Sequence, residues 1–162
     1  MERAIDENPQ NEKRRTAMTD KAAEKLKSLG WSIVEATGFI ALVGPLWHRV
    51  VGDVHEYALI TQDKHHNRRG VVQGGVYMTF ADRTCGMTAR FVSDSPSLAT
   101  VQMDTHFVDS AKIGEILMSK PRMIRATRSL IFITTEVTAD ERCIATANGV
   151  FKVMNDGRER AK

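Results

Sequence analysis

One helical pattern constrains the fold of this chain more than any other feature of its sequence. The pattern opens at Gly74-Gly75 and runs to about Phe91, with small residues on several of its sides, namely Ala81, Thr84, Cys85, Gly86 and Thr88. A helix with small residues all round is normally enclosed by other structure rather than laid along a surface. The pattern therefore predicts a long, central, buried helix.

The segments before and after this helix have the character of strands. After Pro96 the apolar period becomes two, in four segments rich in Val, Ile, Phe and Thr that span 99–108, 114–125, 129–138 and 143–153. Before the helix, 39–50 and 55–61 are also expected to be extended, with a bend at Gly44-Pro45. Pro121 indicates a bulge or an edge position within its segment. The order predicts an α+β fold with an antiparallel sheet wrapped around one long central helix, because alternating βαβ units would need more helices.

The chain of 162 residues has the length of one domain, which we place at 19–154. Residues 1–18 are almost all polar, which predicts a flexible N-terminal arm, and 155–162 are expected to form a flexible C-terminal tail. A short amphipathic helix is expected from Thr19 to a stop at Gly30. Because no signal peptide or membrane-spanning segment is recognisable, we expect a cytoplasmic protein without a membrane partner.

Charge and metal-ligand patterns exclude two classes of function. The net charge of +3 is too small to predict a nucleic-acid partner. His65 and His66 are adjacent and expected in a solvated loop, and the other histidines are scattered, so no metal site is predicted. The two cysteines, Cys85 and Cys143, are expected to be free thiols.

The start of the predicted helix is suited to binding an oxygen that becomes negatively charged. Gly74 and Gly75 allow a ligand to approach the backbone closely, and the first helical turn has unsatisfied N–H groups. A thioester carbonyl becomes an oxyanion when it is attacked, so the Gly74 N–H is a candidate oxyanion-hole donor.

Asp82, on the same helix, is the candidate acid of the site. A carboxylate among small and apolar residues is rarely without a partner. Asp82 lies eight residues beyond Gly74, which is about 12 Å along a helix axis. That separation is too great for one helix to present both groups to one carbonyl, whereas two antiparallel helices from two chains would bring them together. We therefore expect a homodimer with shared active sites, with a further pairing into a dimer of dimers left open.

The residues of this region carry a family resemblance. The string His66-Asn67-x-x-Gly70-x-x-Gln73-Gly74-Gly75, followed by Asp82, resembles the HNxxGxxHGGxxxxxxD signature of PaaI-like and 4-hydroxybenzoyl-CoA-type hot-dog thioesterases. The likeness covers about residues 20–154 and includes Thr100 and the closing strands. It implies a hot-dog fold and an acyl-CoA thioesterase that needs no cofactor, because coenzyme A is part of the substrate.

The resemblance also implies roles for individual residues. Asp82 would be the nucleophile or general base, Asn67 would position water or the acid, and Gly74 would donate its N–H to the thioester oxygen. Thr100 would lie near the leaving sulfur or the attacking water. Gln73 stands where the family has His, and Gln can orient a thioester but cannot carry a proton near neutral pH. The candidates for substrate binding are Gly75, His66, Arg90 and Arg128, the two arginines as ligands of the CoA phosphates.

Other readings of the same residues stay open at the level of sequence. Asn67 alone would be interpreted as a turn residue, and Asp82 alone as a structural acid. Gln73 leaves open a non-catalytic acyl-CoA-binding protein. A hot-dog hydratase or dehydratase is less favoured, because the central helix carries no His. The acyl group is not specified.

Overall fold

The computed structural model describes residues 9–93 and 97–154. Its elements are α1 (Pro9–Ser28), β1 (Ser32–Ile33), α2 (Gly38–Val43), β2 (Leu46–Val51), β3 (Val54–Ile60), a 3-10 turn η1 (Asp63–His65), α3 (Gly74–Ser93), β4 (Leu98–Phe107), β5 (Ile116–Ser119), β6 (Arg122–Ala126), β7 (Leu130–Ala139) and β8 (Arg142–Val153).

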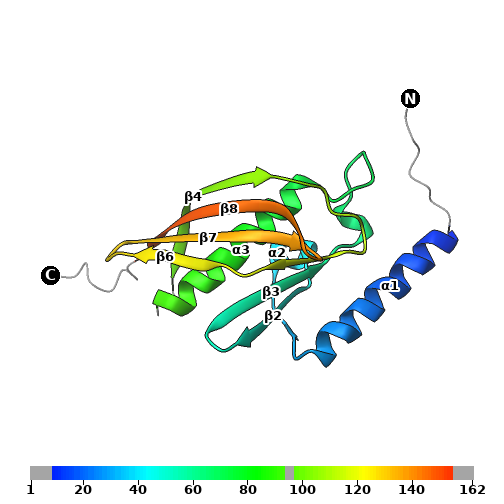
Figure 1. Ribbon diagram of the computed structural model, residues 1–162, viewed down its shortest axis with the longest axis horizontal. Coiled ribbons are helices and arrows are strands. Elements are labelled where there is room, and N and C mark those ends of the chain that lie inside the picture. The colour runs from blue at the N-terminus through cyan, green and yellow to red at the C-terminus, as the bar shows by residue number, and fades with distance from the viewer. Residues whose placement is uncertain (1–8, 94–96, 155–162) are drawn as a thin grey trace.

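The strands form one antiparallel sheet that wraps around α3. The strand order is β1-β2-β3-β5-β7-β8-β4, and β6 pairs with β7 beside this path. Every pairing is antiparallel. Helix α3 lies across one face of the sheet and contacts β3, β4, β6, β7 and β8 (Figure 1). The predicted α+β hot-dog fold and its central helix are therefore confirmed.

The sheet is covered on both faces where β3 passes through it. Tyr57 and Leu59 of β3 belong to the main core beneath α3, whereas Ala58 and Ile60 pack on the opposite face. That second core contains Leu26 of α1 together with Trp31 and Trp47. Because both faces are buried, β3 is apolar throughout its second half instead of alternating.

A buried chain of hydroxyls fixes α3 against the sheet. The side-chain oxygens Thr84 Oγ1 and Ser119 Oγ lie 2.9 Å apart, and Ser119 Oγ lies 2.8 Å from Thr135 Oγ1. Thr84 also donates to the Ala81 carbonyl oxygen at 3.2 Å. All three hydroxyl residues are buried, so these bonds set the position of the turn of α3 that carries Asp82.

Two elements differ from the sequence prediction, and a third is divided where an irregularity was expected. The segment 39–50 is not one bent strand, because its first part forms the short helix α2 and only Leu46–Val51 is a strand. Pro121 separates β5 from β6, and a register shift follows between Met123 and Arg125, so the predicted irregularity is confirmed.

The first helix begins ten residues earlier than predicted, at Pro9 instead of Thr19. Residues 9–18 are therefore helical, and the predicted start of this helix was wrong. Proline is favoured in a first helical turn, because its missing N–H has no partner to lose there. The rest of the predicted arm, 1–8, and the predicted tail, 155–162, lie outside the described residues.

Candidate active site

The carboxylate of Asp82 has the partner that its position requires. Asp82 is half-buried in the middle of α3, and the Thr100 hydroxyl donates to its Oδ1 at 2.8 Å. Thr100 lies in β4 next to a register shift between Thr100 and Gln102. The hydrogen bond therefore orients the carboxylate through one of its two oxygens. It also brings together two residues that are 18 positions apart in the chain.

The first turn of α3 presents the predicted unsatisfied N–H. Gln73 precedes the helix, its backbone oxygen accepts from Val76 N at 2.9 Å, and its own N–H donates to the His65 oxygen at 2.8 Å. Within residues 9–93 and 97–154, no acceptor is found for the Gly74 N–H. A Cβ at Gly74 would lie 3.3 Å from two atoms of the Phe107 ring, so glycine fits closely at this position.

Asn67 holds the loop that leads into α3. Its Oδ1 accepts the backbone N–H groups of Arg69 at 2.8 Å and Val71 at 3.4 Å, and its backbone oxygen accepts from Gly70 N at 2.9 Å. Gly70 has φ +78, the left-handed region in which glycine is unstrained. The turn interpretation of Asn67 is therefore confirmed. The amide nitrogen is not part of these bonds and stays a candidate for contact with substrate.

Part of the predicted site shares one cleft. A cleft of about 530 Å³ is lined by His66, Asn67, Arg68, Arg69 and Gln73. It lies just ahead of the α3 N-terminus, to which Gly74 and the exposed Gly75 belong. The structure therefore gathers the predicted residues His66, Asn67, Gln73, Gly74 and Gly75 at one end of the helix.

The remaining predicted site residues do not lie at the cleft that contains Asn67. Asp82 and Thr100 are paired about two helical turns further along. Arg90 is exposed in the last turn of α3, and Arg128 is exposed between β6 and β7. One chain therefore carries two separate parts of the predicted site, and neither arginine lines the cleft that contains Asn67.

His65 is buried, so its predicted place in a solvated loop was wrong. Only 3% of the residue is exposed. Its Nδ1 accepts from Gln62 N at 2.9 Å, so Nε2 carries the proton and donates to the Val43 oxygen at 2.8 Å. Burial holds the pKa of His65 below its usual value. The ring thus joins α2 to the loop that leads into α3, a structural function.

His48 and His55 are not scattered, because neighbouring strands bring them together. The ring nitrogens His48 Nε2 and His55 Nδ1 lie 2.9 Å apart, and both rings stack with Phe91. Burial lowers the pKa of both histidines. In the described part of the chain, no group of three or more potential metal ligands is found, and the absence of a metal stays a prediction.

Cys85, three residues from Asp82, is unsuited to act as a nucleophile. It is fully buried in a cluster with Ala89, Ile131 and Phe151. Burial, together with the nearby charge of Asp82, raises the pKa of the thiol to about 12. The side chain is therefore protonated near neutral pH and fills space in the core.

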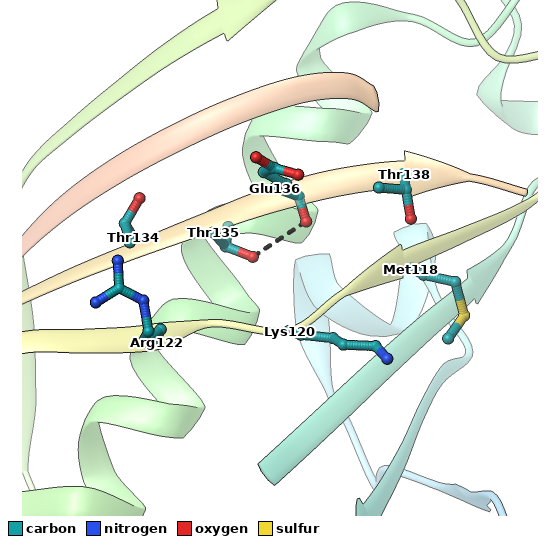
Figure 2. Close-up of a pocket in the computed structure, with 7 residues that line it drawn as sticks. All are labelled: Met118, Lys120, Arg122, Thr134, Thr135, Glu136 and Thr138. Atoms are coloured by element: carbon teal, nitrogen blue, oxygen red, sulfur yellow. Dashed lines mark hydrogen bonds between the residues drawn. The ribbon is translucent and has the colours of Figure 1, made fainter. Parts of the chain in front are cut away.

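A second hollow on the sheet contains none of the predicted site residues. This groove across β5, β6 and β7 has a volume of about 410 Å³. Figure 2 shows its lining residues, Met118, Lys120, Arg122, Thr134, Thr135, Glu136 and Thr138. Beside it Lys120 Nζ lies 2.6 Å from Glu56 Oε1. This pairing satisfies a buried carboxylate, so we interpret Lys120 as a structural residue.

Comparison with known proteins identifies the family. Residues 69–144 match the family described as the thioesterase superfamily. A candidate esterase of Pseudomonas aeruginosa is 30% identical over 95 residues, which are 58% of this chain and 71% of that protein. The chain belongs to the thioesterase superfamily. The predicted hot-dog thioesterase family is confirmed, and membership supports thioester hydrolysis as the general class of reaction.

Several solved structures share the fold. Zebrafish thioesterase superfamily member 2 has a TM-score of 0.66 at 20% identity, over 88% of this chain and 95% of that one. A mutant of the phenylacetic acid degradation protein PaaI of Thermus thermophilus has a TM-score of 0.64 at 14% identity, over 72% and 98% of the two chains. A Streptococcus mutans protein bound to acetyl-CoA has a TM-score of 0.59 at 22% identity, over 63% and 82%. In the described residues of this thioesterase-superfamily chain, no helix is long and apolar enough to cross a membrane.

Two features of the site escaped the sequence reasoning. The backbone oxygen of His65 accepts the Gln73 N–H. The neighbours of His65 in the sequence are polar, so no sequence pattern indicated that its side chain is buried. Arg83, directly after Asp82, is half-buried and lines a cleft with α2. Arg83 could have been selected from the sequence, because it is a charged residue inside a helix that was predicted to be buried.

Proposed function

We propose that this protein is an acyl-CoA thioesterase in which Asp82 of one chain acts on a thioester held at the α3 N-terminus of a second copy. The observation that carries the proposal is the hydrogen bond from Thr100 to Asp82 Oδ1 at 2.8 Å. It holds a half-buried carboxylate in one orientation, as a nucleophile or general base requires. The acetyl-CoA in the Streptococcus mutans relative supports a CoA thioester as the substrate class.

The reaction would divide the work between the two parts of the site. The Gly74 N–H, which lacks an acceptor in the described chain, would bind the thioester oxygen as negative charge develops on it. Gln73 and Asn67, which share a cleft beside it, would orient the carbonyl and a water. With Asp82 as general base, the water oxygen bonds to the carbonyl carbon and the C–S bond breaks. The proton taken by Asp82 then passes to the leaving thiolate.

The geometry supports a dimer in which each site takes residues from both chains. Asp82 and Gly74 lie on the same helix about 12 Å apart along the axis. Strand β4 ends the sheet with its free edge unpaired within the described residues, and Val101 and Phe107 on it are 60% and 55% exposed. A long edge strand that exposes apolar side chains favours pairing with another chain.

An antiparallel pairing would also explain the position of Arg90. If Asp82 of one chain faces residue 74 of the second copy, Arg90 lies about two turns past the start of the second helix, on the side of the loop that precedes it. Arg90 would then lie beside the cleft of the other chain, where a CoA phosphate could be bound. Arg128 is a second candidate for binding a CoA phosphate.

Three further expectations stay predictions: a dimer of dimers, a cytoplasmic location and the absence of nucleic-acid partners.

Release of free CoA thiol from a panel of acyl-CoAs tests the proposal, with Asp82→Asn as the matched variant. We expect hydrolysis by the wild type and a loss of about 10³-fold or more in the variant, because Asn cannot take a proton. If the wild type binds acyl-CoA without releasing thiol, the protein is a non-catalytic acyl-CoA-binding protein. The Gln at position 73, in place of His, would then explain the missing hydrolysis.

Mixing two inactive variants tests whether the site is shared. Gly74→Pro removes the proposed donor N–H at a position where a helix tolerates proline. The exposed Phe107 ring, 3.3 Å from the added Cβ, has to shift slightly to admit it. Mixed dimers of Asp82→Asn and Gly74→Pro would contain one intact site in two, so random exchange should restore about a quarter of the wild-type rate. No recovery in confirmed mixed dimers would contradict the shared site.

A further inference from the structure

Arg83 is an enclosed cation with no partner in the described part of the chain. It follows Asp82 in α3, is half-buried, and its Nε is enclosed without a hydrogen-bond acceptor. Two other arginines are paired with carboxylates, Arg49 with Glu56 at 2.7 Å and Arg142 with Asp109 at 2.6 Å. Enclosing a guanidinium N–H without an acceptor is unfavourable. The rest of the side chain lines a cleft, so an anionic ligand there that brought an acceptor within reach of the guanidinium would offset this cost.

The space in front of Arg83 is a cleft between α3 and the segment that leads into α2. Its volume is about 630 Å³, and its other lining residues are Glu35, Ala36, Thr37 and Ile40. Helix α2 buries none of its residues, and Phe39 and Leu42 are 63% and 71% exposed. The cleft itself combines the apolar side chains of Ala36 and Ile40 with Thr37 and two opposite charges, Glu35 and Arg83.

Glu35 is the opposing charge in this cleft. It is exposed, and no ion pair joins it to Arg83 within 4.0 Å in the described residues. A carboxylate at this distance weakens the attraction for an anion without neutralising the cation. Replacing Glu35 should therefore strengthen binding of an anionic group at Arg83.

The position of Arg83 favours the acyl end of a substrate over its CoA end. Adjacent residues of a helix project about 100° apart from Cα atoms about 3.8 Å apart, so Arg83 extends from the same turn as the reacting carboxylate. The phosphates of CoA are separated from the thioester by the whole pantetheine arm. We propose, building on the thioesterase function above, that the Arg83 cleft binds the far end of the acyl group and selects acyl-CoAs that end in a carboxylate.

Adipyl-CoA and hexanoyl-CoA provide the matched test, because both acyl chains have six carbons and only one ends in a carboxylate. We expect the wild type to favour adipyl-CoA in kcat/KM. In Arg83→Gln the ratio of the two kcat/KM values should fall about ten- to hundredfold, as for a lost charge-assisted hydrogen bond. Arg83→Lys should retain part of the preference, and Glu35→Gln should increase it. Arg122→Gln removes the same charge from the groove on the sheet and should leave the ratio unchanged.

Each outcome separates this inference from the thioesterase proposal. Hydrolysis of both substrates with no adipyl preference, or equal losses for both in a folded Arg83→Gln variant, overturns the acyl-end assignment while the thioesterase function stands. The second result would assign Arg83 to CoA. If neither substrate is hydrolysed, the thioesterase proposal fails, and calorimetric binding of the two compounds to Asp82→Asn decides whether the cleft selects the carboxylate. If Arg83→Gln does not fold, the opposite shifts expected of Arg83→Lys and Glu35→Gln provide the same decision.

Discussion

The hydrogen bond between Thr100 and Asp82 allows the catalytic proposal to be tested without removing the acid itself. Thr100→Val keeps the β-branched shape that suits strand β4 and removes only the hydroxyl that donates to Oδ1 at 2.8 Å. A hydrogen bond to a charged group contributes about 1.5–3 kcal/mol. Because Thr100 is exposed and Asp82 only half-buried in the single chain, we take the lower value, which corresponds to roughly tenfold in rate.

The expected result is a tenfold loss in kcat with little change in KM, because the bond orients the acid and does not touch the distant parts of the substrate. Thr100→Ser restores the hydroxyl and should recover most of the rate. The assay is release of CoA thiol from the best substrate of the panel, with thermal unfolding measured on each variant. Full activity in the valine variant would refute the orienting role of Thr100. A serine variant as slow as valine would assign the effect to packing of the methyl group.

Three further predictions concern the parts that hold the site. Ser119→Ala breaks two bonds of the buried hydroxyl chain and should lower the free energy of unfolding by about 1.5 kcal/mol; a loss below about 0.5 kcal/mol in chemical denaturation would contradict the role given to this chain. Burial lowers the pKa of His65 in the folded protein, so the unfolded chain binds a proton more readily. The contribution of neutral His65 to the free energy of unfolding is therefore complete above the unfolded pKa of about 6.5 and is lost as pH falls below it. His65→Gln should therefore be less stable at pH 7.5 yet show a smaller fall in stability from pH 6.5 to 5, and an unchanged pH slope would show that His65 does not contribute to it. The buried thiol of Cys85, with its pKa raised to about 12, should resist a thiol reagent at pH 8 until the protein is unfolded, whereas rapid reaction of two thiols in the native protein would contradict its burial.

The misplaced elements share a physical cause. Residues 39–43 are apolar and few, and a short apolar run has the same appearance in a buried strand and in a helix turn. The first turns of α1 carry mainly polar residues, so no apolar stripe marks the true start of the helix at Pro9. In both places the choice depends on contacts with distant segments, which local propensity does not encode.

The sequence alone determined three features, because each follows from the pattern of neighbouring residues. They are the position of α3, the strands that follow it, and the grouping of Gln73 with the glycines. A period of 3.6 among small residues predicts an enclosed helix, and a period of two predicts strands with one buried face. The residue types around Gly74 and Asp82 also sufficed to predict the thioesterase family.

Only the tertiary structure decided which side chains meet. Thr100 reaches Asp82 because β4 returns beside α3, and His65 is buried because α2 and the loop close over it. Arg83 is enclosed without an acceptor for the same reason, since its surroundings come from residues more than 40 positions away in the chain. Burial and charge pairing are properties of three-dimensional neighbours, and neighbours far apart in sequence are set by packing rather than by any local pattern.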